Sequence, residues 1–509
     1  MTEFIDQPND IVESHPGLGP VPGDNVLPGA SSAPTGRRSR RRGHLLAIGA
    51  GVVAVTVVAA GGVAVGMSLS GGGGQPEDLV PADAVAYLDV DLDPAAGQKV
   101  DALRFFRHFP SAESALGNGD DLRAFIAKAF TSSSVDYASQ IQPWLGKRYA
   151  VAVLPGARSG PPTVEGVLQV TDEALARQDL PKVFPSGYDF TVTDGFAVIT
   201  SSPASAESLV SQARQSSLGR SSAFTDALAP YGDGVASFYV DVPGLDQLAK
   251  GVVPGLGGAL STSPLFPQQV TGAIAGVVKF EPDAVEVLAG GPASGRPGAP
   301  STLVTTLPDT TAAAIGISGS GDTVAKMWDP MVSQMSAMSG RTPAEETAQL
   351  ERASGLTLPV DLIALLGSQL SLSVDSQGLA GFPLFGYQAE TDPTTAQSGM
   401  SAVTKLMRKA GVSLTTTTRS DGIVMASTPG YANTLASADG TLGSSPAFLA
   451  AVPDADGAAE VVYVDLATIL DATGVATSKD LAPLKSLGAS VHADGGRDTY
   501  RMRLTVSGG

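Results

Sequence analysis

The order of apolar and polar residues along the chain switches repeatedly between two periods. Alternation of apolar with polar residues predicts β-strands, and apolar residues that recur every three or four positions predict helices. The turn dipeptides Asp194-Gly195 and Pro282-Asp283 separate adjacent strand patterns and indicate antiparallel hairpins. The strands expected in the first half are Val85–Asp91, Tyr149–Leu154, Gly166–Val170, Phe190–Val192, Phe196–Thr200, Val235–Val242, Ile274–Phe280 and Val285–Leu288.

Helical periodicity lies between these strands. It predicts helices at Gly97–Phe109, Asp120–Phe130 and Ala204–Gln215. Near the end of the chain, Thr499–Val506 alternates cleanly, so one face of its sheet is expected to be buried and the other to meet water. The sequence therefore predicts an α+β fold with a largely antiparallel sheet and packed helices in each of two units.

One apolar run is longer than a core helix needs. Leu45 to Leu69 is almost wholly Ala, Val, Gly, Leu and Ile, and about 20 apolar residues cross a bilayer. Five arginines at 37–42 precede the run, so the positive-inside rule predicts a cytoplasmic N-terminus and an extracytoplasmic C-terminal region. A cleaved signal peptide is the alternative, but the run exceeds the roughly 7–15 residues usual for the apolar part of a signal peptide, and no convincing A-x-A cleavage site follows it. We expect a single-pass protein of the cell membrane.

An internal repeat divides the region after this run. Asp194, Phe224 and Asp241 recur as Asp421, Phe448 and Asp465, at offsets of 227, 224 and 224 residues. Such steady offsets predict two homologous units. The expected organisation is a disordered cytoplasmic tail with the Arg cluster at 1–43, a transmembrane helix at 44–70, a Gly-rich linker at 71–76, ectodomain unit 1 at 77–304 and ectodomain unit 2 at 305–509.

Composition narrows the chemistry and the partners. The 509 residues include no Cys, only 4 His, and 32 basic against 50 acidic side chains, for a net charge of −18. The lack of Cys excludes disulfides, thiolate nucleophiles and Cys-ligated metals. The acidic surplus makes nucleic acid a poor partner. The expected partners are the membrane and an envelope protein, lipid or polymer, and neither a cofactor nor a metal is expected.

The stretch at 80–99 reads VPADAVAYLDVDLDPAAGQK. It resembles the ectodomain opening, P-A-D-A-x-A-Y-x-x-V-D-L-D-P-A-x-G-Q-K, of an uncharacterised actinobacterial family of single-pass membrane proteins with a domain of unknown function. The likeness extends over most of 77–509. The resemblance implies the same localisation and architecture, and it brings no activity, ligand or catalytic residue.

Three carboxylates at alternate positions in this stretch suggest a metal site as one interpretation. The spacing of Asp89, Asp91 and Asp93 superficially resembles the start of a calcium loop, which requires Gly at the sixth position and Glu at the twelfth. Pro94 and Val100 occupy those positions. A strand is therefore favoured, with Asp89 and Asp91 on its wet face.

The helix expected at 97–109 interleaves basic and aromatic residues, a pattern that can bind anionic ligands. Helical spacing, however, favours Leu103 and Phe106 in the core and Arg104 and Arg107 in solvent. If the first unit has a ligand or partner surface, the residues expected to contribute to it are Asp89, Asp91, Arg104 and Arg107.

Catalytic signals are weak. His108 and His492 fall at unlike positions in the two units, and the sequence has no G-x-S-x-G, H-E-x-x-H or Walker motif. We therefore expect a membrane-anchored extracytoplasmic binding or structural protein of the cell envelope, not an enzyme. The alternative is an exported carboxylate-dependent hydrolase of envelope polymers, which two convergent carboxylates would favour. An apolar groove would favour a lipidic or peptide partner.

Overall fold

The computed structural model describes much of the region after the expected span. It covers residues 74–92, 96–116, 136–156, 162–184, 187–201, 204–252, 272–293, 295, 298–437, 439–474, 478–494 and 496–507. The expected tail at 1–43, the span at 44–70 and the helix at Asp120–Phe130 lie outside these residues. Within the described ranges, no helix combines the length and apolarity needed to cross a membrane.

Antiparallel strands form the framework of both halves of the chain. Those of the first half are β1 Ala86–Asp91, β2 Leu145–Leu154, β3 Thr163–Val170, β4 Tyr188–Thr193, β5 Phe196–Ser201, β6 Ala236–Asp241, β7 Ala273–Glu281 and β8 Ala284–Pro292. Those of the second half are β9 Thr311–Ser318, β10 Gln369–Asp375, β11 Leu384–Glu390, β12 Thr415–Thr418, β13 Gly422–Ala426, β14 Glu460–Asp465, β15 Leu484–Ala493 and β16 Arg497–Val506. Every strand expected in the first half is present.

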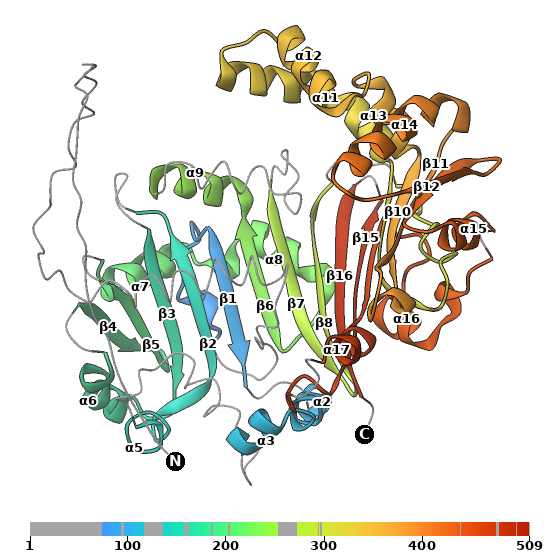
Figure 1. The fold of residues 1–509 in the computed structure, drawn as a ribbon. Coiled ribbons are helices and arrows are strands. Elements are labelled where there is room, and N and C mark those ends of the chain that lie inside the picture. Colours follow the sequence, from blue (N-terminus) through green and yellow to red (C-terminus); the bar gives the residue numbers. More distant parts are fainter. Residues whose placement is uncertain are drawn as a thin grey trace, which may run out of the picture. The chain divides into compact units, whose positions relative to one another are not determined.

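The described strands belong to one sheet, in the order β12-β13-β11-β10-β9-β14-β15-β16-β8-β7-β6-β1-β2-β3-β5-β4 (Figure 1). Outward from the β8–β16 pair, both halves show the same topology, so β9 takes the place of β1 and β10 that of β2. The prediction of a separate sheet in each unit is wrong. As the last strands of their halves, β8 and β16 would otherwise present unpaired edges, and instead they pair with each other. The limits 77–304 and 305–509 themselves stay predictions.

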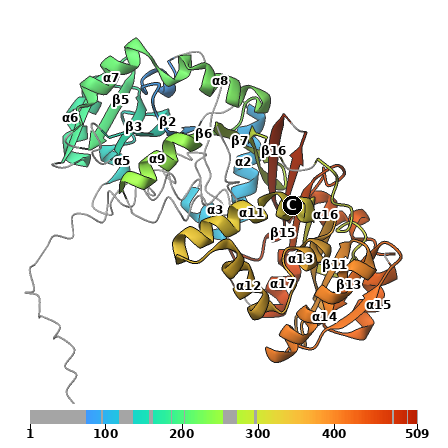
Figure 2. The same ribbon diagram turned by 90° about the horizontal axis from the view of Figure 1, so that it is seen from above.

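Helices connect the strands and cover parts of both sheet faces (Figure 2). The expected helix at 97–109 is present but begins one residue earlier and ends two residues earlier, and the expected helix at 204–215 begins two residues later. In the first half the helices are α2 Ala96–Arg107, α3 Pro110–Leu116, α5 Tyr137–Gln140, α6 Glu173–Val183, α7 Ala206–Gln215, α8 Ser222–Leu228 and α9 Val242–Val252. In the second half they are α11 Ser320–Ser339, α12 Pro343–Ser354, α13 Val360–Leu366, α14 Pro393–Lys409, α15 Pro429–Ser437, α16 Pro446–Ala451 and α17 Leu466–Thr473.

The two faces of the sheet have different cores. On one face, here the α8 face, helices α7 and α8 pack on Tyr87 and Tyr239, and α15 and α16 pack on Tyr463. On the opposite face, here the α2 face, α2 and α6 pack on Val90 and Phe280. Helices α13 and α14 cover the same face at the other end of the sheet. Each half is therefore sandwiched between helices, whereas the middle strands are covered less completely.

The hairpin turn between β4 and β5 forms as its dipeptide predicts. Asp194 and Gly195 have φ angles of 55° and 79°, both in the left-handed region. A two-residue turn with two positive φ angles matches the twist of the flanking strands, and Asp-Gly is a favoured sequence for it. The turn fixes the register in which Thr193 lies opposite Phe196.

Candidate functional site

The two carboxylates predicted to face water are buried on the α8 face. Asp89 is 4% and Asp91 2% exposed. Ser237 on β6 donates a hydrogen bond to Asp89, and Arg148 on β2 lies 3.4 Å from Asp91. The wet-face prediction is wrong because helices cover both faces of the sheet in this half. Both carboxylates help to hold β1 between its neighbours.

The segment that leads into β1 joins the same buried network. The Tyr87 hydroxyl donates to Glu77 over 3.0 Å. Burial is the main cause that raises the pKa of Glu77, and burial together with the Glu77 charge raises the pKa of Tyr87 well above its usual value. A side-chain nitrogen of Arg148 lies 3.3 Å from the Gly74 carbonyl. This polar cluster fastens the entry of the chain to the sheet.

Arg104 and Arg107 lie on the exposed side of α2, as predicted, and Leu103 and Phe106 are buried beneath it. Arg104 is 3.9 Å from Asp101 one turn earlier. Helix α2, however, packs on the α2 face, opposite the face that buries Asp89 and Asp91. The structure therefore does not bring the four candidate residues together. Their role as a ligand or partner surface stays a prediction.

Gln98 has a structural role that the sequence analysis missed. Its side-chain amide donates to the Phe280 carbonyl over 2.7 Å and accepts from the Phe280 N–H over 2.9 Å. These two hydrogen bonds hold α2 against β7, where Phe105 and Phe106 pack on the Phe280 ring. The sequence signal that could have pointed to this role was the Gly-Gln-Lys at the end of the stretch at 80–99.

A row of apolar side chains crosses the α2 face of the middle strands, and we call it the apolar row. Each member lies directly opposite the next across the strand ladder. The row runs over eight strands and is roughly 30 Å long, at the usual spacing between strands. Its members are Tyr387, Leu372, Ile315, Val462, Ala489, Met502, Val287 and Val278.

Part of the apolar row is open to solvent. Val278 is buried under α2, but Ile315 is 40% and Leu372 48% exposed, and the members between are half-buried. The next row of the pleat is also apolar where Ala313, Val464 and Leu487 lie opposite one another. Contiguous exposed apolar surface on a folded chain marks an interaction site.

Helix α11 carries a second exposed apolar surface. It lies beside α12 and α13 in Figure 1 and buries Trp328 and Val332. Met327, Met331 and Met338 are 42%, 40% and 83% exposed, and their spacing places them on one side of the helix. Methionine side chains are flexible and polarisable, so such a surface adapts to irregular apolar partners.

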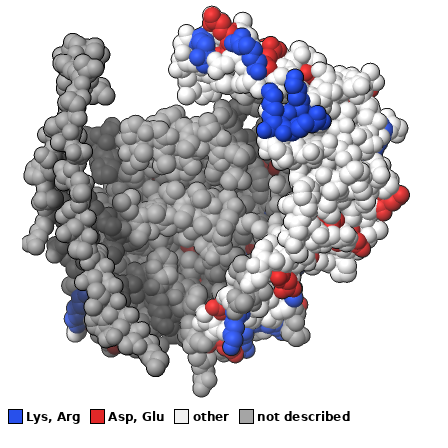
Figure 3. All heavy atoms as spheres, viewed as in Figure 1, with Lys and Arg blue, Asp and Glu red and all other residues white. Residues whose placement is uncertain are grey.

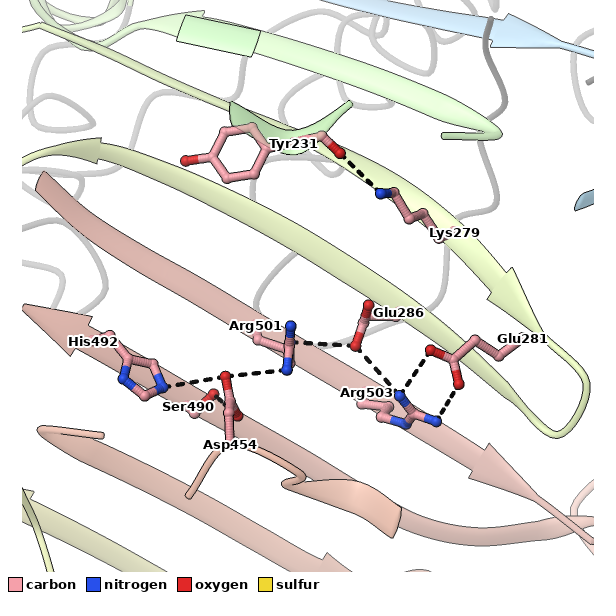
Figure 4. A network of polar contacts seen from close by, with 9 residues as sticks. All are labelled: Tyr231, Lys279, Glu281, Glu286, Asp454, Ser490, His492, Arg501 and Arg503. Atoms are coloured by element: carbon pink, nitrogen blue, oxygen red, sulfur yellow. Dashed lines mark hydrogen bonds and ion pairs between the residues drawn. The ribbon is translucent and has the colours of Figure 1, made fainter. Parts of the chain in front are cut away.

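Charged residues cluster where the two halves meet on the α8 face, and we call this cluster the charged seam (Figure 4). Arg501 on β16 lies 3.3 Å from Glu286 on β8 and 3.3 Å from Asp454. Arg503 contacts Glu286 at 3.4 Å and also Glu281. Because Glu286 is only 6% exposed, its two arginines neutralise a carboxylate that burial would otherwise penalise.

Ser490, Asp454 and His492 form the part of the seam that most resembles a hydrolase site. Ser490 donates to Asp454 over 2.7 Å, and a His492 ring nitrogen lies 3.1 Å from the other carboxylate oxygen. The carboxylate thus stands between the hydroxyl and the imidazole (Figure 4). A Ser nucleophile needs its base in direct contact, so this order of groups is unsuited to activating Ser490. No group of three His, Asp or Glu side chains in the described ranges could hold a metal ion.

Glu165 on β3 is a buried acid without a partner. It is 0% exposed, and neither carboxyl oxygen has a hydrogen-bond partner among the described residues. Burial, with a smaller contribution from the Asp83 charge, raises its pKa to about 8. Glu165 is therefore mostly protonated at neutral pH, and it lies on the α8 face of β3, where its neighbour across the ladder, Ala152, is part of the core.

Residues 46–193 match the family model for a protein of unknown function, DUF3352, so a domain of that family is found there. The match includes the stretch at 80–99. No curated protein matches the chain.

Among solved structures, the chain is similar to crystal form I of TP0453, at 12% identity and a TM-score of 0.23, over 43% of this chain and 79% of that one. Crystal form IV gives 13% identity and a TM-score of 0.24, over 43% and 80%.

Replacing Arg501 by Met is expected to lower the free energy of unfolding by about 2 kcal/mol. The substitution removes one of two partners of a buried carboxylate, and Arg503 keeps the other contact. Arg214→Met is the matched control, because its ion pair with Asp194 is exposed on both sides and should contribute less than about 1 kcal/mol. Urea denaturation measures both, and an equal loss in the two variants would contradict a stabilising seam.

The Glu165→Gln variant is expected to have a higher free energy of unfolding than the wild type, and the difference is expected to grow as the pH rises. The folded-state pKa of about 8 exceeds the ordinary value of 4.5, so the folded state binds more protons. Wild-type stability is then greatest below about pH 4.5 and falls as the pH rises toward 8. At pH 7 the gain for the variant is on the order of 3 kcal/mol. Urea denaturation across this range tests it, and a gain that does not change with pH would contradict it.

Proposed function

We propose that this protein is a membrane-tethered, extracytoplasmic binding protein of the cell envelope that holds the acyl part of a lipid. The apolar row is the surface that carries the proposal. Family membership among the actinobacterial single-pass proteins is part of the same proposal, and the resemblance at 80–99 supports it.

The exposure of the apolar row supports a lipidic ligand over a polar polymer. Leaving Ile315 and Leu372 in water costs about 25 cal/mol for each Å² of apolar surface, which an apolar ligand would recover. The row is roughly 30 Å long, and the hydrocarbon part of one bilayer leaflet is about half as thick. An extended acyl chain therefore fits within the length of the row.

The predicted tether supports the membrane as the source of that ligand. The expected span ends at residue 70, and the Gly-rich linker at 71–76 joins it to the described segment that leads into β1. Six residues reach at most about 20 Å. Bilayer lipid would then be the most abundant apolar material near the ectodomain.

The hydrolase alternative has less support. The seam contains carboxylates, but Glu281 and Glu286 are engaged by Arg503, and Asp454 is engaged by Arg501, Ser490 and His492. Catalytic carboxylates must be available to protonate a leaving group or to attack. We therefore favour binding over catalysis. If the protein does not bind lipid, an envelope protein or polymer is the partner that we expect instead.

Replacing Leu372 by Gln is expected to weaken lipid contact at the apolar row several-fold, because it removes the most exposed apolar side chain of the row. The test adds a photoactivatable fatty acid to membranes that carry the full-length protein, and mass spectrometry maps the label. We expect label on the peptides that contain Ile315 and Leu372.

Leu449→Gln is the matched control. Leu449 on α16 is also 48% exposed, and it lies on a helix of the α8 face. This variant should keep the wild-type labelling of β9 and β10. Label that is as strong around Leu449 as around Leu372, or that Leu372→Gln leaves unchanged, would contradict the proposal.

A further inference from the structure

A polar groove lies between α14 and the edge strand β12, at one end of the sheet. Its volume is about 940 Å³, within the range of small-molecule sites. The lining contains two cationic side chains, several hydroxyls and no carboxylate. It consists of Pro393, Thr394, Gln397, Met400, Ser401, Thr404, Lys405, Arg408, Thr416, Thr417 and Thr418.

The helical residues of this groove recur every three or four positions, so they share one side of α14. On β12, Thr416 and Thr418 lie opposite Met425 and Ile423, which places them on the α2 face beneath the helix. Their hydroxyls form no hydrogen bond within the described part of the chain. They are available as donors to a ligand in the groove.

The cations of the groove are available as well. Lys405 and Arg408 are exposed, as is the neighbouring Lys409, and none of their side chains forms an ion pair or hydrogen bond with another described residue. Figure 3 shows basic side chains gathered over α14. The chain has a net charge of −18, so acidic residues are abundant, yet none of them lines this groove to neutralise its cations. Basic residues in a last helical turn complement the helix dipole, but that role leaves their charged ends free for a ligand.

An apolar neighbour distinguishes a membrane ligand from a soluble one. Leu406 is 45% exposed and lies about one helical turn before the exposed Lys409, so these two side chains are neighbours on α14. Exposed apolar and basic residues side by side on a helix are typical of contact with an anionic bilayer surface. A free phosphate would need the cations and hydroxyls but not Leu406.

We propose that the α14–β12 groove binds the headgroup of an anionic membrane lipid through Lys405, Arg408 and the hydroxyls of β12. This site is separate from the apolar row and does not depend on acyl binding there. It would hold the second half of the chain at the bilayer surface.

The test uses full-length protein in detergent micelles, titrated with phosphatidylglycerol or with phosphatidylcholine, and native mass spectrometry counts the bound lipid. Wild-type protein should prefer the anionic lipid. Lys405→Glu and Arg408→Glu should each lower that preference roughly tenfold, because each basic residue near a bound headgroup adds to its affinity. Arg408→Lys should retain most of it.

Arg220→Glu is the matched control, since it reverses one exposed charge outside the groove. It should keep the wild-type preference. Leu372→Gln should leave the ratio of anionic to zwitterionic lipid unchanged, which separates this proposal from the apolar row. An equal effect of Arg220→Glu and Arg408→Glu, or no preference in the wild type, would overturn the proposal. So would displacement of the lipid by an equal concentration of inorganic phosphate.

Discussion

The antiparallel pairing of β8 with β16 is the constraint on which the rest of the structure depends. These strands end the two halves of the chain, and each satisfies the backbone groups that the other would leave at an edge. Because the pairing is continuous, side chains from both halves fall into common rows. The charged seam on the α8 face and the apolar row on the α2 face both cross this joint.

The two faces of the joint impose different requirements. On the α8 face, Glu286 is buried and needs its arginines, so the seam fixes the joint through charge-assisted contacts. On the α2 face, Met502 and Val287 lie opposite each other in a row that helices cover only in part. On the α8 face the charged groups are paired with one another, whereas the α2 face leaves apolar surface that a ligand can cover. This contrast is why we place binding on the α2 face.

Local pattern was enough to predict the strands and two helices of the first half, because period and turn dipeptides are local signals. It failed for Asp89 and Asp91, since alternation distinguishes the two faces of a strand but does not show that helices cover both of them. Their partners Ser237 and Arg148 are 148 and 57 residues away along the chain. Helix α6 was not predicted, and a Pro at 181 and the scarcity of large apolar residues obscure its period. The apolar row depends on register between distant strands, which no local pattern records.

The most direct test of the account is a pair of cysteines at Val287 and Met502. The chain has no cysteine of its own, so any disulfide in the variant must come from the introduced pair. Directly opposite residues of an antiparallel pair have Cα atoms about 4.5–5.5 Å apart, which a disulfide can bridge. The account predicts that mild oxidation links 287 to 502 within one chain, and that a pair at 287 and 489, one strand further, stays reduced. Linkage of the second pair but not the first would contradict the shared sheet.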